Sequence, residues 1–138
     1  MTNPRPPRIL DASAVVALFA GHPDVMMMLQ EAEAGRMTLT LPSMAVAEAQ
    51  AVLRAAPSMW HHIFAYPGIH EQPLTWNGAI DAGLIAAPRL EHHPMQPALI
   101  GPIMVGQIVD EATAMNAVVV TTLPEAYGAY NVALLVLP

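Results

Sequence analysis

The stretch VVVTTLPEAYG, residues 118–128, predicts a buried strand that leads into a turn. Three consecutive valines favour a strand, because β-branched side chains pack well on a pleated sheet. Pro124 cannot donate a hydrogen bond to a β-ladder, so the strand should end before it. Outward from this stretch, short apolar segments alternate with helical segments along the chain. That alternation predicts an α/β fold around a mainly parallel sheet of four or five strands.

The expected elements follow from this alternation. Strands are expected over residues 8–11, 37–42, 68–74, 117–122 and 132–138. Helices are expected over residues 12–20, 22–35, 44–56, 58–66, 78–87 and 98–115, with a proline-containing loop over 88–97. Pro73 places the third strand at an edge of the sheet, because proline interrupts a central ladder. No internal repeat or linker is evident, so residues 1–138 are expected to form a single domain.

The composition is apolar for a water-soluble monomer. Apolar residues make up 54% of the chain and charged residues 12%, and ten residues are methionine. The mean hydropathy is +0.41. A homodimer interface would bury the extra apolar surface, and methionine suits an adaptable contact. An ordinary large core explains the same composition equally well.

The charge balance argues against an extensive RNA-binding surface. The net charge is −6, and the five arginines are scattered along a chain without lysine, whereas nucleic-acid affinity comes mainly from cations that meet phosphates. No segment has the run of about 20 apolar residues that a membrane-spanning helix needs, and the N-terminus does not resemble a signal peptide. The absence of cysteine excludes disulfides and fits a cytoplasmic protein.

Two carboxylates lie at positions where a charge is costly. Asp11 follows the first predicted strand, at the edge of a parallel sheet where ligands usually bind. Glu48 lies inside an otherwise apolar predicted helix. Such groups cost free energy unless something pairs with them or binds to them. They can form a functional site; alternatively, Asp11 caps the next helix and Glu48 faces solvent, and residue types alone favour this second interpretation.

Three segments in order resemble one protein family. ILDASAVVALF (9–19), LPSMAVAEAQAVL (41–53) and VVVTT (118–122) are similar to the PIN-domain family, typified by the ribonuclease toxins of bacterial toxin–antitoxin pairs. The segment 108–128 resembles actinobacterial members in particular. The resemblance covers nearly the whole chain and implies a three-layer α/β/α sandwich.

The resemblance also implies an acidic site for Mg²⁺ or Mn²⁺. In this family the metal activates a water and offsets charge on the phosphate that is cut. By resemblance, Asp11 matches the first acid and Glu48 the second, at the usual separation. Ser13 matches a hydroxyl that supports the first acid, and Thr121 matches the threonine of a Thr-x-Asp step. The fourth acid would fall at Leu123, where it is absent.

The third acid of the family is also absent. It would fall at Met104, Val105 or Gly106, and none of these binds a hard cation. Asp110 and Glu111 lie about 140° and 240° around the helix from Val105, at about 100° per residue. Both are therefore expected on a solvated helix face.

Asp11 and Glu48 alone would hold Mg²⁺ or Mn²⁺ weakly, since magnesium sites rely on carboxylates together with substrate phosphates. We therefore expect a degenerate PIN-like protein, catalytically weak or inactive, that acts through protein contacts or as a regulatory or toxin–antitoxin-type component. Its expected partners are a second copy and an antitoxin or DNA-binding protein. The alternative is a Mg²⁺-dependent toxin-type ribonuclease that uses Asp11 and Glu48 on RNA.

Overall fold

A computed structural model describes residues 5–92 and 97–138 of the chain. Its centre is a five-stranded parallel sheet in the order β3-β2-β1-β4-β5. The strands are β1 (Arg8–Leu10), β2 (Leu39–Pro42), β3 (Ile69–Gln72), β4 (Val118–Thr121) and β5 (Ala133–Val136). The five predicted strands and the mainly parallel sheet are thus confirmed. The strand that Pro73 follows, β3, is at an edge, as predicted.

Six α-helices and one short 3₁₀ helix connect the strands in the described residues. They are α1 (Ala12–Phe19), α2 (Pro23–Glu33), α3 (Ser43–Leu53), α4 (Pro57–Phe64), α5 (Trp76–His92), α6 (Pro102–Met115) and η1 (Pro124–Tyr127). The helix predicted over 98–115 begins only at Pro102, because the residue before a proline disfavours helical geometry. Gly101 accordingly has an extended backbone, with ψ 135°.

The loop predicted over residues 88–97 is wrong in its first part, and its residues 93–96 lie outside the described residues. Helix α5 continues through Pro88 to His92. Proline removes one helical hydrogen bond, but α5 packs closely on α6 over much of its length. At Gly106 of α6 there is no room for a Cβ beside the backbone carbonyl of Ala82. This tertiary packing outweighs the local preference of Pro88.

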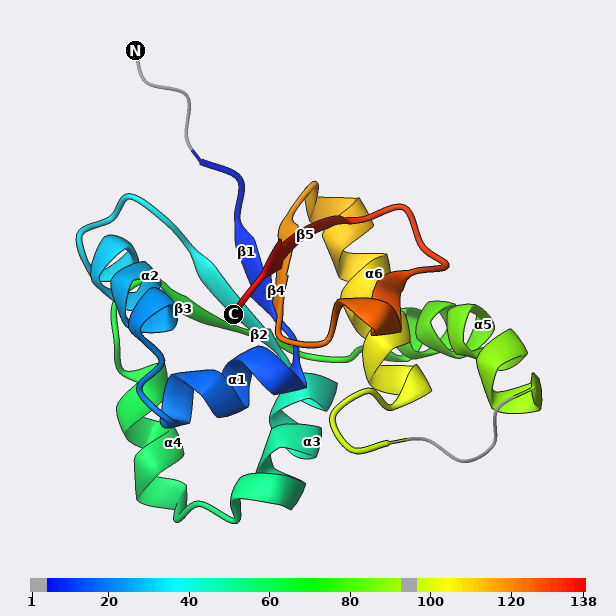
Figure 1. Cartoon of the computed structure of the whole chain (residues 1–138), viewed down its shortest axis with the longest axis horizontal. Helices are drawn as coiled ribbons and strands as arrows, with labels where there is room; N and C mark the ends of the chain where they lie inside the picture. Colours follow the sequence, from blue (N-terminus) through cyan, green and yellow to red (C-terminus); the bar gives the residue numbers. More distant parts are fainter. Residues whose placement is uncertain (1–4, 93–96) are drawn as a thin grey trace.

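The sheet is covered on both faces, which makes a three-layer α/β/α sandwich (Figure 1). Along β1, Leu10 belongs to a buried cluster shared with α1 and α2, and Ile9 belongs to a second cluster shared with α6. Both side chains are fully buried. Successive strand residues point to opposite faces, so a strand with two covered faces is apolar throughout. This is why the central strands β1 and β4 lack the alternation of a half-exposed sheet, whereas the edge strand β3 exposes His70 and Glu71.

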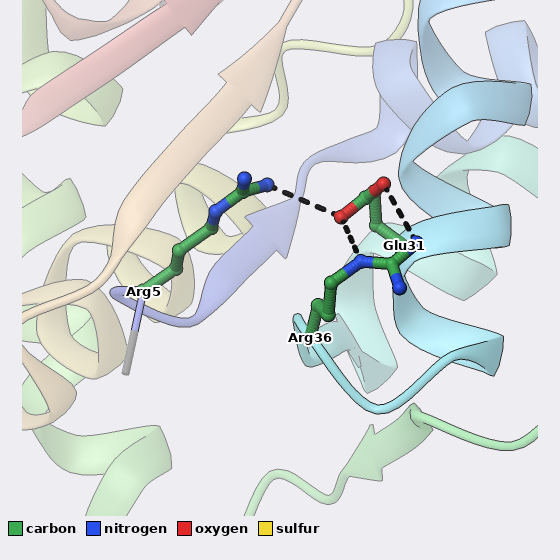
Figure 2. Close-up of polar contacts among 3 residues, drawn as sticks. All are labelled: Arg5, Glu31 and Arg36. Atoms are coloured by element: carbon green, nitrogen blue, oxygen red, sulfur yellow. Dashed lines mark hydrogen bonds and ion pairs between the residues drawn. The ribbon is translucent and has the colours of Figure 1, made fainter. Parts of the chain in front are cut away.

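An exposed ion-pair cluster joins the N-terminal segment to α2 (Figure 2). The Glu31 carboxylate accepts from Arg36 Nε at 2.7 Å and from Arg5 Nη1 at 3.3 Å. The arginine side chains are 59% and 55% exposed, respectively. Ion pairs this exposed contribute little to stability, because water and salt screen them.

Candidate functional site

The Asp11 carboxylate is buried at the carboxyl edge of β1, where it begins α1. Its Oδ1 accepts hydrogen bonds from the Ser13 hydroxyl at 2.7 Å and from the Ala14 backbone N–H at 3.0 Å. The residue is 0% exposed. Asp11 is thus the N-cap of α1, so the capping interpretation of this residue is confirmed. Capping does not exclude a second role, because Oδ2 points away from the helix bonds.

Ser13 and Thr121 lie beside Asp11, although 108 residues separate them in sequence. Their hydroxyl oxygens are 3.2 Å apart. The Ser13 hydroxyl also accepts from the Thr122 backbone N–H at 2.9 Å, and Thr121 Oγ1 accepts from the Leu123 N–H at 2.9 Å. Both hydroxyls are buried. They tie the turn after β4 to the start of α1 and fix the surroundings of Asp11.

Tyr127 of η1 completes the surroundings of Asp11, and sequence reasoning missed it. Its hydroxyl donates to Asp11 Oδ2 at 2.9 Å, and the side chain is 1% exposed. Burial, followed by the negative charge of Asp11, raises the pKa of Tyr127 above its ordinary value. A buried tyrosine needs a partner for its hydroxyl, but no local pattern in PEAYG points to an aspartate 116 residues away.

Burial also raises the pKa of Asp11. Hydrogen bonds from Thr121, Ser13, Ala14 and Tyr127 oppose this effect, because they stabilise the charged form. These donors are all uncharged. The Asp11 carboxylate is therefore solvated by dipoles of the protein.

Glu48 of α3 is partly buried and does not simply face solvent. Its Oε2 accepts from the Gly101 backbone N–H at 3.2 Å. A Cβ at residue 101 would collide with the Glu48 carboxylate, so glycine allows this close approach. Burial raises the pKa of Glu48, the Gly101 hydrogen bond opposes the shift, and the charge of Asp11 adds to it. The two carboxylates are thus within electrostatic reach of each other.

The positions expected for the third acid lie in the core. Met104 and Val105 are 0% exposed, and Gly106 abuts the backbone of Ala82. Leu123, at the fourth position, is partly buried and packs against the same core cluster. Residues 104–106 and Leu123 therefore pack in or against the apolar core and offer no side-chain oxygen to a cation.

Glu111 is not on a fully solvated face, which corrects the prediction. Gln107, 1% exposed, accepts from the Met44 N–H at 3.0 Å and donates to Glu111 Oε1 at 3.1 Å and the Gln72 carbonyl at 3.4 Å. The other Glu111 oxygen is buried without a hydrogen-bond partner. Burial, only partly opposed by Gln107, raises the pKa of Glu111 to about 7. This network joins α6 to α3 and β3.

The donor set around Asp11 does not fit a tightly held Mg²⁺ or Mn²⁺. These cations need several oxygen ligands, of which carboxylates are the strongest. Within the described ranges, no group of three or more His, Asp or Glu side chains could hold a metal ion. Three protein donors already bond to the Asp11 oxygens, and the Glu48 carboxylate is bonded to Gly101.

Comparison with known proteins supports the fold. No protein-family model and no curated protein matches the chain. Among solved structures, the crystal structure of VapBC2 from Rickettsia felis, bound to a DNA fragment from their promoter, matches with a TM-score of 0.64 at 17% identity. The match covers 95% of this chain and 98% of that one. The fold is PIN-like. At 17% sequence identity, this similarity shows the fold alone.

In the part of the chain that the structure describes, no single helix is long and apolar enough to cross a membrane. Helices α1 and α2 pass the length and composition test only as a pair, bent by 90°.

Proposed function

We propose that this chain is a PIN-like component of a toxin–antitoxin-type system that works through protein contacts and cleaves RNA weakly or not at all. The observation that carries the proposal is the hydrogen-bonding of Asp11. Its Oδ1 caps α1 and its Oδ2 accepts from Tyr127. The expected places of two further acids, one among residues 104–106 and one at Leu123, hold no acid. The similarity to a VapBC2 structure supports the toxin–antitoxin setting. The setting implies a cytoplasmic protein.

Helix α5 supplies the contact surface of the proposal. Trp76, Ile80 and Leu84 are spaced by four residues, so they share one helix face. Their exposed fractions are 74%, 55% and 70%. The opposite face, with Ala82 and Ala86, is buried. We propose that a second copy covers the exposed face, because one apolar helix stripe is self-complementary across a two-fold axis and the whole chain is rich in apolar residues.

A second partner is expected if the chain belongs to a toxin–antitoxin-type system. The VapBC2 structure is of proteins bound to promoter DNA, and this chain has only five cationic side chains with which to meet phosphates. We propose that an antitoxin-like protein supplies any DNA contact. In a pull-down of the chain with a candidate antitoxin-like protein, a stable complex is the expected result.

Light scattering on the purified chain tests the proposed dimer. Leu84→Glu should convert a dimer to a monomer, because it places a charge in the apolar stripe. Val52→Glu, on α3 and also half exposed, is the matched control and should remain dimeric. A monomeric parent chain, or dissociation by both variants alike, would contradict the proposed surface.

The runner-up function is a Mg²⁺-dependent ribonuclease that uses Asp11 and Glu48, supported by Ser13 and Thr121. It is favoured by the close grouping of Asp11, Ser13 and Thr121 and by the electrostatic influence of Asp11 on Glu48.

RNA cleavage separates the two functions. Purified chain is incubated with a structured and an unstructured RNA, in Mg²⁺, Mn²⁺ or EDTA, beside Asp11→Asn as control. We expect no cleavage that requires metal and depends on Asp11. Cleavage that needs the cation and disappears in Asp11→Asn would establish the ribonuclease and overturn the proposal.

A further inference from the structure

We infer that Tyr127 is an internal competitor of divalent cations: its hydroxyl occupies Oδ2 of Asp11, and a cation can bind this carboxylate only after the hydroxyl has left. The inference rests on the proposed function, since it names what closes the Asp11 site in a chain proposed to be catalytically weak.

The first argument is the number of donors on one carboxylate. Each carboxylate oxygen offers about two acceptor positions. Both bonds to Oδ1, from Ser13 and Ala14, belong to the capping of α1 and its neighbouring turn. Oδ2 is the oxygen left for a ligand, and the Tyr127 hydroxyl donates to it at 2.9 Å. Oδ2 keeps a second acceptor position, but Asp11 is 0% exposed, so that position is not open to solvent. A cation would therefore take the direction that the hydroxyl now holds, and it cannot share this direction with a donated O–H, because both bear positive charge.

The second argument is that the tyrosine ring is packed in place. Tyr127 belongs to the same buried cluster as Met104 and Val105, the residues at the expected place of the third acid. All three are at most 1% exposed. The ring and the apolar side chains therefore fill one continuous space beside Asp11. A set of residues that packs this closely maintains the hydrogen bond as well as the core.

The third argument is that the backbone of η1 is anchored around the tyrosine. The Ala126 N–H donates to the Leu123 carbonyl at 3.1 Å, and the Tyr130 N–H donates to the Tyr127 carbonyl at 3.0 Å. Leu123 is itself held by Thr121. The hydroxyl thus arrives at Asp11 from a segment whose position is fixed by β4.

The size of the effect follows from competition. When only a fraction of molecules is open to a ligand, the apparent Kd rises by the inverse of that fraction. A hydrogen bond to a charged group shifts such an equilibrium by roughly 10- to 100-fold. Removal of the hydroxyl should therefore tighten cation binding by about that factor.

The experiment titrates Mn²⁺ into the purified full-length chain by calorimetry. Tyr127→Phe removes the hydroxyl and keeps the ring, and should bind Mn²⁺ about 10- to 100-fold more tightly than the parent chain. Tyr130→Phe is the matched control, because among the described residues its lost hydroxyl bonds to the Ile85 carbonyl, at 3.4 Å, and not to Asp11; its affinity should equal that of the parent. The double variant Asp11→Asn with Tyr127→Phe should lose the gain.

Two results would overturn the inference: Tyr127→Phe binding Mn²⁺ no more tightly than the parent, or the gain surviving in the double variant. A measurement on the parent keeps the test independent of variant folding. The Tyr127 hydroxyl proton should exchange slowly with water in NMR spectra, and exchange as fast as that of an exposed tyrosine would equally refute the inference. Metal-dependent RNA cleavage by the parent overturns the proposed function, whereas an unchanged Mn²⁺ affinity of Tyr127→Phe overturns only the role of Tyr127.

Discussion

Asp11, the N-cap of α1, and Glu31, in α2, are two carboxylates that are stabilised in opposite ways. Glu31 is paired at the surface with Arg36 and Arg5 (Figure 2), and its pKa is lowered, first by the Arg36 hydrogen bond. Asp11 is buried among uncharged donors, and burial raises its pKa. The surface pair has charge compensation but little effect on folding; the buried carboxylate lacks a cation but organises three segments of the fold. Burial and the arrangement of hydrogen-bond donors, more than charge pairing, decide which carboxylate contributes to the stability of the fold.

Removal of each carboxylate should produce the largest contrast. Asp11→Ala deletes the cap of α1, leaves the Tyr127 hydroxyl without its acceptor and removes the 2.7 Å bond of Ser13, so the free energy of unfolding should fall by about 2–4 kcal/mol. Glu31→Ala should barely move the urea midpoint, because its partners remain hydrated. Urea unfolding followed by circular dichroism measures both. Equal shifts of the urea midpoint in the two variants would show that the buried and the surface carboxylate contribute equally to stability.

Loss of one donor sharpens the contrast. Tyr127→Phe removes a single hydrogen bond from a buried carboxylate and should lower the free energy of unfolding by about 1–2 kcal/mol. Tyr130→Phe, which loses a longer bond to a backbone carbonyl, should cost less. Urea midpoints of the two variants give the comparison. If Tyr130→Phe lowers the free energy of unfolding more than Tyr127→Phe does, the bond to Asp11 is not the stronger of the two.

The smallest expected effect concerns pH. The pKa of Glu111 is raised from 4.5 to about 7, so folding favours its protonated form. Its contribution is complete below pH 4.5 and is lost as the pH rises through 7, whereas the lowered pKa of Glu31 acts in the opposite direction. Because solvent screens a half-buried group, the loss should be about 1 kcal/mol.

Urea unfolding between pH 4.5 and 8 measures this loss, with Glu111→Gln as the variant that cannot titrate. The parent chain should lose stability relative to Glu111→Gln as the pH rises. A difference between the two proteins that stays constant over this range would show that Glu111 titrates normally.

Sequence patterns predicted the elements of the fold because the central strands β1 and β4 are largely apolar on both faces, and because prolines and glycines mark the ends of several elements. Prediction from local sequence failed at Pro88, because the packing of α5 on α6 keeps this residue helical. Asp11 could be found because it follows a strand directly. Tyr127 could not, since its hydrogen bond to Asp11 depends on how distant segments meet in space. The buried oxygen of Glu111 likewise follows from neighbours on other elements.

The contact between Gly106 and the backbone of Ala82 limits how the acidic set could ever be enlarged. Any side chain at residue 106 would push α5 away from α6, so an aspartate introduced there would change the spacing of two helices before it could serve as a ligand. Leu123 directly precedes η1 and is only partly buried. Of the two, residue 123 is the one at which a redesign could add an oxygen donor while leaving the helical layer intact.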